Sequence, residues 1–156
     1  MAQAIPHAER SKTFFALLFV DLDKFKLVND LYGHSIGDGL LKAVARRLDE
    51  CIRKEDTVAR AGGDEFVIVL REISHTKDAA KIGGKIVQAL AHPFQVGRHE
   101  LDISCSVGIS VYPKDGKDIN TLMINADTAM YQAKRAGRNA YKFFIPSSAV
   151  ASNQTQ

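Results

Sequence analysis

The chain has 156 residues, of which 46% are hydrophobic and 25% are charged, and its formal net charge is +3. This length suffices for one domain with a real core, and the composition is that of an ordinary soluble globular protein. So small a net charge argues against a nucleic-acid partner and suits a protein that binds a small polyanion at a local basic patch.

The first predicted elements are a buried strand and two helices. Residues 1–13 are mostly polar and are expected to be a tail or the end of a helix. Phe14–Val20 is continuously apolar, which is typical of a strand buried on both faces. Lys24–Leu31 predicts a short helix, and residues 36–52 repeat apolar side chains with a helical period. Residues 32–34 contain a glycine and separate the two helices.

The centre of the chain predicts a hairpin. Thr57–Ala61 is short and extended, and Phe66–Leu70 reads as a second buried strand. Gly62 and Gly63 join them, since glycine adopts positive φ without a Cβ clash. The next residues, Asp64-Glu65, are therefore expected at a tight turn beside a buried strand.

The second half of the chain alternates helices with strands. Residues 79–90 and 119–133 carry helical apolar stripes, and residues 101–111 alternate as in a strand with one covered face. Tyr141–Ile145 predicts the last strand, and residues 146–156 predict a disordered tail or linker. The order β-α-α-β-β-α-β-α-β predicts an α+β fold, with a mixed β-sheet flanked by helices.

Carboxylates follow the first strand and open the second hairpin strand. If these two strands are neighbours, Asp21 approaches Asp64 and Glu65. Carboxylates gathered at one point repel one another unless a cation joins them, and Mg²⁺ prefers such hard oxygen ligands. A structural interpretation is also open: Asp21 or Asp23 could be the N-cap of the following helix, with Asp23 the better candidate, and acidic residues after a Gly-Gly turn are usually only solvated.

Taken together, these pieces resemble the GGDEF domain of bacterial diguanylate cyclases. The match is ordered and correctly spaced from about Phe15 to about Phe144. It comprises Asp21-Leu22-Asp23, Lys26, Asn29-Asp30, Tyr32-Gly33-His34, Gly37-Asp38, Arg60, Gly62-Gly63-Asp64-Glu65-Phe66, Tyr131-Gln132-Ala133-Lys134 and Gly137-Arg138-Asn139.

The resemblance implies a fold and an activity. The implied domain covers residues 14–145 and has a ferredoxin-like fold related to the polymerase palm and the nucleotidyl cyclases, with the GGDEF motif on a β-hairpin. The implied reaction condenses two GTP into cyclic di-GMP and pyrophosphate. In it, a ribose 3′-hydroxyl attacks an α-phosphate with the assistance of Mg²⁺ or Mn²⁺, two ions per site.

The resemblance also assigns roles to residues. Asp64 and Glu65 are implied to be catalytic, and which of the two does which job is open. The implied metal ligands are Asp21, the Leu22 carbonyl, Asp64 and Glu65. The implied substrate-binding residues are Phe25, Asn29, His34, Asp38, Lys134 and Arg138.

Several of these residues also have structural interpretations. Asn29 and Asp38 resemble guanine readers, because one carboxylate can accept both N1–H and N2–H of guanine, but Asp38 also suits the dipole at a helix N-terminus. A lone histidine after a Tyr-Gly turn, such as His34, is more often structural. Lys134 and Arg138 share a helix face if the helix reaches that far, and otherwise belong to a solvated basic face.

Arg53 and Asp56 form a second candidate site. They lie i, i+3 at the end of the long predicted helix, and their distance from Gly62-Gly63 matches the inhibitory Arg-x-x-Asp site of the family, where cyclic di-GMP binds. An arginine can stack on or fork to guanine, and an aspartate can accept from its edge. The alternative is an ordinary surface ion pair, which is weak in water.

The resemblance also implies partners. Two GTP molecules must meet face to face, so a homodimer is expected for turnover, together with a sensor or EAL phosphodiesterase domain in a longer protein. The family usually carries an Asp-x-Leu-Thr-x-Leu-x-Asn-Arg segment before the first strand, and residues 1–13 contain none. One competing hypothesis is therefore a weakly active or inactive regulatory domain that binds GTP or cyclic di-GMP. An RNA-binding module is disfavoured, because the strands lack an aromatic platform.

A cytoplasmic location is expected for this domain, although the full-length protein could be attached to a membrane. No signal peptide precedes Phe14–Val20, and this apolar run is too short to span a bilayer. Cys51 and Cys105 have neither metal-type spacing nor a disulfide pattern, which favours a reducing compartment.

Overall fold

A computed structural model of the chain describes residues 4–11 and 13–146. The helices are α1 (Ala4–Ser11), α2 (Phe25–Tyr32), α3 (His34–Cys51), α4 (Thr76–Leu90) and α5 (Ile119–Arg135). The strands are β1 (Phe14–Asp23), β2 (Thr57–Gly62), β3 (Glu65–Ile73), β4 (Phe94–Val96), β5 (His99–Leu101), β6 (Ser104–Tyr112) and β7 (Ala140–Phe143).

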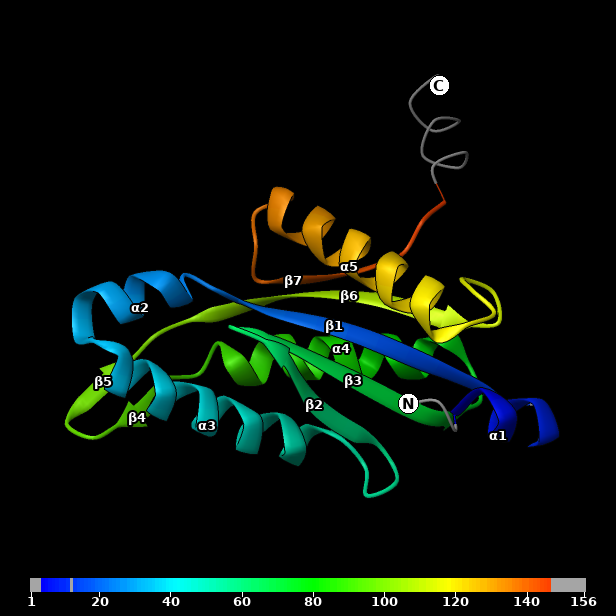
Figure 1. Cartoon of the computed structure of the whole chain (residues 1–156), viewed down its shortest axis with the longest axis horizontal. Coiled ribbons are helices and arrows are strands. Elements are labelled where there is room, and N and C mark those ends of the chain that lie inside the picture. The colour runs from blue at the N-terminus through cyan, green and yellow to red at the C-terminus, as the bar shows by residue number, and fades with distance from the viewer. Residues whose placement is uncertain (1–3, 12, 147–156) are drawn as a thin grey trace.

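A five-stranded sheet in the order β2-β3-β1-β6-β7 forms the centre of the fold (Figure 1). Neighbouring strands are antiparallel except β6 and β7, which are parallel. Helices cover both faces of the sheet, with α3 and α4 on one side and α5 on the other (Figure 1). The structure thus confirms the predicted α+β fold with a mixed sheet and a hairpin that carries the GGDEF motif.

Strand β1 lies in the middle of the sheet because its apolar run can be buried on both sides. It pairs with β3 at one edge and β6 at the other. Leu18 and Val20 face the core under α3 and α4, whereas Leu17 and Phe19 face the core under α5. By this alternation Asp21 and Asp23 face the α5 side, and both are buried.

The prediction that residues 101–111 form one strand with a single covered face is wrong. Strand β6 begins at Ser104, and its residues are buried on both faces from Cys105 to Tyr112. The small residues that suggested a solvent face instead let α5 approach closely. A Cβ at Gly108 would lie 1.9 Å from the backbone oxygen of Ala126. The small residues of β6 therefore indicated a close contact with α5 and not a face exposed to solvent.

The second, two-stranded sheet was not predicted. Strands β4 and β5 form an antiparallel hairpin, and Leu101 belongs to it. Gly97, with φ of +59°, turns the chain between them. This glycine after a short apolar run was the available sequence signal, but strands of three residues have too little pattern to be recognised.

The structure gives little information on the predicted domain boundaries near the two ends of the chain. Residues 4–11 do form a helix, and its Ala4 and Ala8 are buried against the sheet. The predicted tail lies outside the described residues apart from Pro146. The boundaries at residues 13 and 145 stay predictions. Within the described ranges, no helix has the length and apolar character needed to cross a membrane.

Candidate active site

Asp21 and the hairpin carboxylates meet at one edge of the β1–β3 pair. Asp21 lies opposite Glu65 in the strand register, and the backbone N–H of Leu22 donates to the carbonyl of Asp64 over 3.2 Å. Gly62 and Gly63 take φ of +149° and +48°, which glycine tolerates without strain. The tight turn therefore places both GGDEF carboxylates beside the end of β1, as the sequence predicted.

The environment of Asp21 strongly favours a nearby cation. Its carboxylate is buried, and Oδ2 forms an ion pair with Nζ of Lys134 on α5. Its Oδ1 is buried with no hydrogen-bond partner in the described structure. The pKa of Asp21 is raised to about 6, mainly by burial and also by the charges of Asp64 and Glu65, against the opposing hydrogen bond and charge of Lys134. Burial is also the main cause that raises the pKa of Glu65, followed by the charges of Asp127 and Asp64.

This donor set fits a hard divalent cation. Among the described residues, no group of three or more His, Cys, Asp or Glu side chains is already arranged as a metal centre. However, one buried oxygen of Asp21 has no hydrogen-bond partner among the described residues, and the pKa of Asp21 is raised mainly by burial and also by the charges of Asp64 and Glu65. A divalent cation would relieve both, since it accepts carboxylate oxygens and offsets their repulsion. The Leu22 carbonyl as a further ligand stays a prediction.

The prediction that Asp23 caps the next helix is wrong. The N-cap of α2 is Lys24, which takes φ of +65° and makes no side-chain cap. The side chain of Asp23 instead accepts hydrogen bonds from Oγ of Ser104 (2.6 Å), Oγ of Ser106 (2.7 Å) and the N–H of Asn139 (3.1 Å). Because β1 continues through Asp23, its side chain points toward β6 and away from the helix start.

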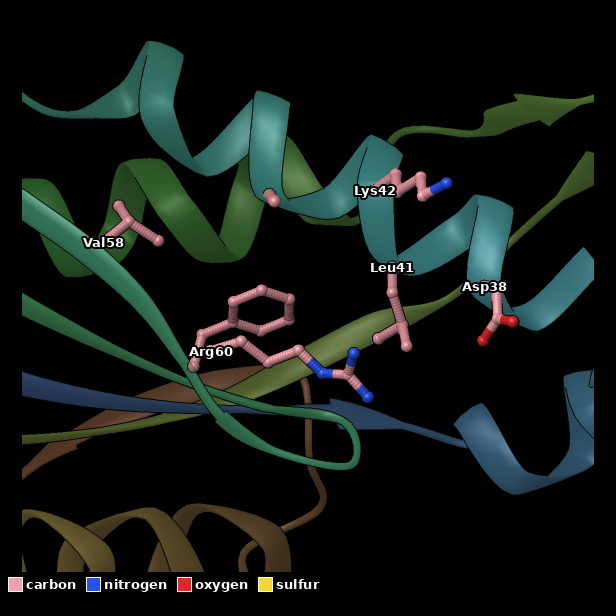
Figure 2. A pocket seen from close by; sticks show the side chains of 7 residues that line it. Asp38, Leu41, Lys42, Val58 and Arg60 are labelled. Atoms are coloured by element: carbon pink, nitrogen blue, oxygen red, sulfur yellow. The ribbon is translucent and has the colours of Figure 1, made fainter.

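A pocket of about 400 Å³ lies between α3 and β2 (Figure 2). Arg60 extends from β2 toward the part of α3 that carries Leu41 and Asp38, and its Nε donates to the carbonyl of Gly63 over 2.9 Å (Figure 2). The carboxylate of Asp38 makes no hydrogen bond or ion pair with any described residue, so it can accept from a ligand. The lining residues are Asp38, Leu41, Lys42, Ala45, Val58, Arg60 and Phe66. Of these, sequence reasoning assigned a role only to Asp38.

The other predicted substrate-binding residues on α2 and at the start of α3 do not all lie at this pocket. Asn29 packs against α3 so closely that a Cβ at Gly37 would lie 1.8 Å from its Oδ1, and no described residue makes a hydrogen bond to this buried oxygen. Phe25 contacts the same glycine position. Gly37 thus brings Asn29 and Phe25 next to Asp38. His34 is exposed at the start of α3 and is not among the residues that line the pocket.

Lys134 and Arg138 do not share a helix face, because α5 ends at Arg135. Gly137 takes φ of +122°, and its N–H donates to the carbonyl of Lys134, while the N–H of Arg138 donates to Ala133. This is a Schellman motif, and Gly137 was the sequence signal for it. Both cations still reach β1, since Nε of Arg138 lies 4.0 Å from Oδ1 of Asp23.

Arg53 and Asp56 lie just past the end of α3, which stops at Cys51. The Asp56 carboxylate is fully buried and accepts from Arg53 N (3.0 Å), Nε (3.1 Å) and Nη2 (3.2 Å), and from Arg71 N (3.0 Å). This hydrogen bonding raises the pKa of Arg53. The pair is therefore not an ordinary surface ion pair. It borders a second pocket, of about 180 Å³, whose lining residues are Arg53, Asp56, Leu70, Ile73, Asp78, Lys81 and Ile82.

Comparisons with known proteins agree with these features. The family model described as "Diguanylate cyclase, GGDEF domain" matches residues 1–140. The bifunctional diguanylate cyclase/cyclic di-GMP phosphodiesterase MucR of Pseudomonas aeruginosa is 51% identical over 100% of the chain and 23% of its own length. The cyclic di-GMP phosphodiesterase PdeR of Escherichia coli is 41% identical over 92% of the chain and 21% of its own length.

A solved structure shares the fold. The GGDEF domain of YfiN (TpbB) from P. aeruginosa superposes with a TM-score of 0.90 and 34% identity, over 93% of the chain and 91% of that structure. The chain spans less than a quarter of the length of MucR and of PdeR. What those whole proteins do is therefore not transferred by similarity alone.

Proposed function

The chain belongs to the GGDEF domain family, and on this premise we propose that it is a diguanylate cyclase, which condenses two GTP into cyclic di-GMP and pyrophosphate. The observation that carries the proposal is the meeting of Asp21, Asp64 and Glu65, where one buried carboxylate oxygen has no partner within residues 4–11 and 13–146. Cationic side chains from α5 and the turn after it reach the same end of β1, as a triphosphate site requires.

The proposed roles follow from the chemistry of each group. Asp21, Asp64, Glu65 and the Leu22 carbonyl would hold one or two Mg²⁺ or Mn²⁺ ions, whose chemistry is to lower the pKa of the attacking hydroxyl and to neutralise phosphate charge. Either Asp64 or Glu65 takes the proton of the ribose 3′-hydroxyl. The 3′-oxygen then bonds to the α-phosphorus, and the bond between this phosphorus and the pyrophosphate oxygen breaks.

Substrate binding is proposed for the surrounding residues. Lys134 and Arg138 offset the charge of the triphosphate and of the departing pyrophosphate. The backbone N–H of Phe25, in the first turn of α2, faces phosphate oxygens. Asn29 and Asp38 accept from the N1–H and N2–H₂ groups of guanine.

Partners follow from the stoichiometry of the reaction. Each protomer presents one GTP, so two protomers must face each other for each 3′-oxygen to reach the α-phosphate of the other nucleotide. We therefore propose a homodimer as the active form. We also propose that, within a longer protein, the domain works beside a sensor or an EAL phosphodiesterase domain, which is supported by the bifunctional name of MucR.

Incubation of the protein with GTP and Mg²⁺ at high protein concentration tests the activity. We expect cyclic di-GMP and two equivalents of pyrophosphate, detected by chromatography, with a specific rate that rises with protein concentration because dimers must form. A covalently enforced dimer is the matched comparison, and it should be active even when dilute. If the enforced dimer binds GTP without forming product, the cyclase proposal fails.

That outcome would favour the second candidate function, a regulatory domain that binds GTP or cyclic di-GMP without turnover. The observation that keeps this candidate open is that PdeR, at 41% identity, is named as a phosphodiesterase. The same purified protein distinguishes the two functions, because nucleotide binding and product formation are measured separately.

Replacing Arg53 with alanine should relieve inhibition by cyclic di-GMP. We propose that the second pocket binds this product, and that the guanidinium of Arg53, 47% exposed, donates to its guanine.

Loss of a charged hydrogen bond should raise the half-inhibitory concentration by about tenfold or more. Initial rates at increasing cyclic di-GMP measure it. Lys54→Ala is the control, since Lys54 is exposed and does not line the pocket. If inhibition by cyclic di-GMP is unchanged in Arg53→Ala, the proposal that this pocket is the inhibitory site is wrong.

A further inference from the structure

The carboxylate of Asp23 is buried, and both of its oxygens accept hydrogen bonds. It is 2% exposed and lies two residues after Asp21 on the same face of β1. Oδ1 accepts from Ser106, and Oδ2 accepts from both Ser104 and the backbone N–H of Asn139. A buried carboxylate requires such donors to offset its lost hydration. Asp23 therefore joins β1, the start of β6 and the turn between α5 and β7.

That turn has an unusual backbone. Gly137, Arg138 and Asn139 take consecutive positive φ values of +122°, +63° and +49°. Residues with a Cβ adopt this left-handed region at a cost, so the surroundings must hold Arg138 and Asn139 there. Asp23 accepts the N–H of Asn139, and its Oδ1 lies 4.0 Å from Nε of Arg138. Both residues after the glycine are thus held by one carboxylate.

Asp23 and Asp21 differ in how many of their carboxylate oxygens accept hydrogen bonds from the protein. Oδ1 of Asp21 has no hydrogen-bond partner in the described part of the chain, whereas both oxygens of Asp23 accept hydrogen bonds. The oxygens of Asp23 are thus already engaged by donors of the protein, whereas Asp21 offers an oxygen to a ligand. The guanidinium of Arg138 remains 54% exposed, so it has donors to spare for a ligand.

We propose that Asp23 is a positioning residue that holds Arg138 where the triphosphate of GTP binds. The inference rests on the proposed function, which assigns Arg138 to the phosphates. Asp23 acts through Arg138 and touches no substrate. Its loss should therefore weaken the binding of nucleotides with a β- and γ-phosphate and leave the binding of GMP nearly unchanged.

A double-mutant cycle with Asp23→Ala and Arg138→Ala tests this coupling. The ligands are 3′-deoxy-GTP, which lacks the attacking hydroxyl, and GMP, and calorimetry measures both affinities in the presence of Mg²⁺. Asp23→Ala should weaken 3′-deoxy-GTP binding by about tenfold and GMP binding by less than about twofold. In the Arg138→Ala background, Asp23→Ala should have no further effect on 3′-deoxy-GTP.

Asp115 offers a matched control. Its carboxylate is also buried and accepts a backbone N–H, that of Val111 over 2.8 Å, but it lies at the opposite end of β6. Asp115→Ala should destabilise the fold without changing the ratio of the two affinities. If Asp23→Ala does not fold, Asp23→Asn replaces it, because the amide oxygen can still accept from Asn139 while the charge that faces Arg138 is lost.

The outcomes separate this inference from the proposed function. Additive effects of the two substitutions, or equal losses for 3′-deoxy-GTP and GMP, would overturn the role of Asp23 while wild-type nucleotide binding still supports the cyclase. Failure of the wild-type protein to bind 3′-deoxy-GTP better than GMP would instead contradict the proposed triphosphate site, and the inference would fall with it.

Discussion

Replacing Asp64 with alanine should lower the rate of cyclic di-GMP formation by about 10³-fold or more, because the reaction loses a metal-binding or proton-accepting carboxylate. The fold should survive. Asp64 is only half-buried, and its described fold contact is through its backbone carbonyl, which accepts from Leu22. Its charge also repels Asp21 and Glu65. The free energy of unfolding should therefore be equal or slightly higher in the variant.

Product chromatography and denaturant unfolding measure the two parts of this prediction. Asp127→Ala is the control, since Asp127 is an exposed carboxylate on α5 whose charge also reaches Glu65 but which has no proposed role. The control should retain activity. If Asp64→Ala retains more than a tenth of the wild-type rate, the assignment of the GGDEF turn to catalysis is wrong.

Comparison with Glu65→Gln divides the work between the two carboxylates. If a variant binds Mn²⁺ as tightly as the wild type but no longer forms product, the residue replaced in it is the proton acceptor. The variant that has lost Mn²⁺ binding identifies the more important ligand. Glu65 is the neighbour of Asp21 in the strand register, so we expect the larger loss of Mn²⁺ binding from Glu65→Gln.

Replacing Asp38 with alanine should abolish the preference for guanine. A dry site that pairs one carboxylate with N1–H and N2–H of guanine rejects adenine by roughly 10⁴-fold, because adenine would leave that carboxylate unpaired. Asp38 is exposed in the free protein, so the bound nucleotide itself would have to exclude water from it. Its carboxylate has no partner among the described residues and lies at a pocket to which Leu41 and Phe66 contribute apolar walls. In the variant, the affinity for GTP should fall toward that for ATP.

Competition binding with GTP, ATP and inosine triphosphate, which lacks the N2 amino group, measures this preference. Inosine triphosphate should bind the wild-type protein with intermediate affinity. Lys42→Ala is the matched control, because Lys42 lines the same pocket one helical turn from Asp38 and its ammonium group cannot accept from the N1–H and N2–H of guanine. If Asp38→Ala keeps the wild-type ratio of GTP to ATP affinity, another group reads the base.

Local patterns predicted those parts of the fold that depend on neighbours in the chain. The apolar run Phe14–Val20 indicated a strand buried on both faces, and it became the central strand. Gly62 and Gly63 indicated the hairpin, because their backbone conformations suit a tight turn. The alternation in residues 101–111 misled, because small residues look the same whether they face solvent or a closely packed helix.

In the candidate site, too, local sequence predicted some features and missed those that depend on distant contacts. The motif residues were recognised in the sequence because their identities and spacing are properties of the chain alone. Sequence reasoning did not find Arg60 as a wall of the base pocket, nor Asp23 as an anchor. It also left open whether the last helix reaches Arg138, although Gly137 supplies the left-handed residue that follows the end of α5.

The amino-acid sequence by itself determined the family, the order of most elements and the carboxylates and cations of the candidate site, because these follow from residue types at short separations. Only the tertiary structure decided which of the two carboxylates at the end of β1 has a free oxygen. The partners of Asp23 lie 81, 83 and 116 residues away in the chain, and no local pattern reports on contacts of that range. Packing of β6 and α5 against β1 brings them together, so that both oxygens of Asp23 accept hydrogen bonds while one oxygen of Asp21 has no partner among the described residues.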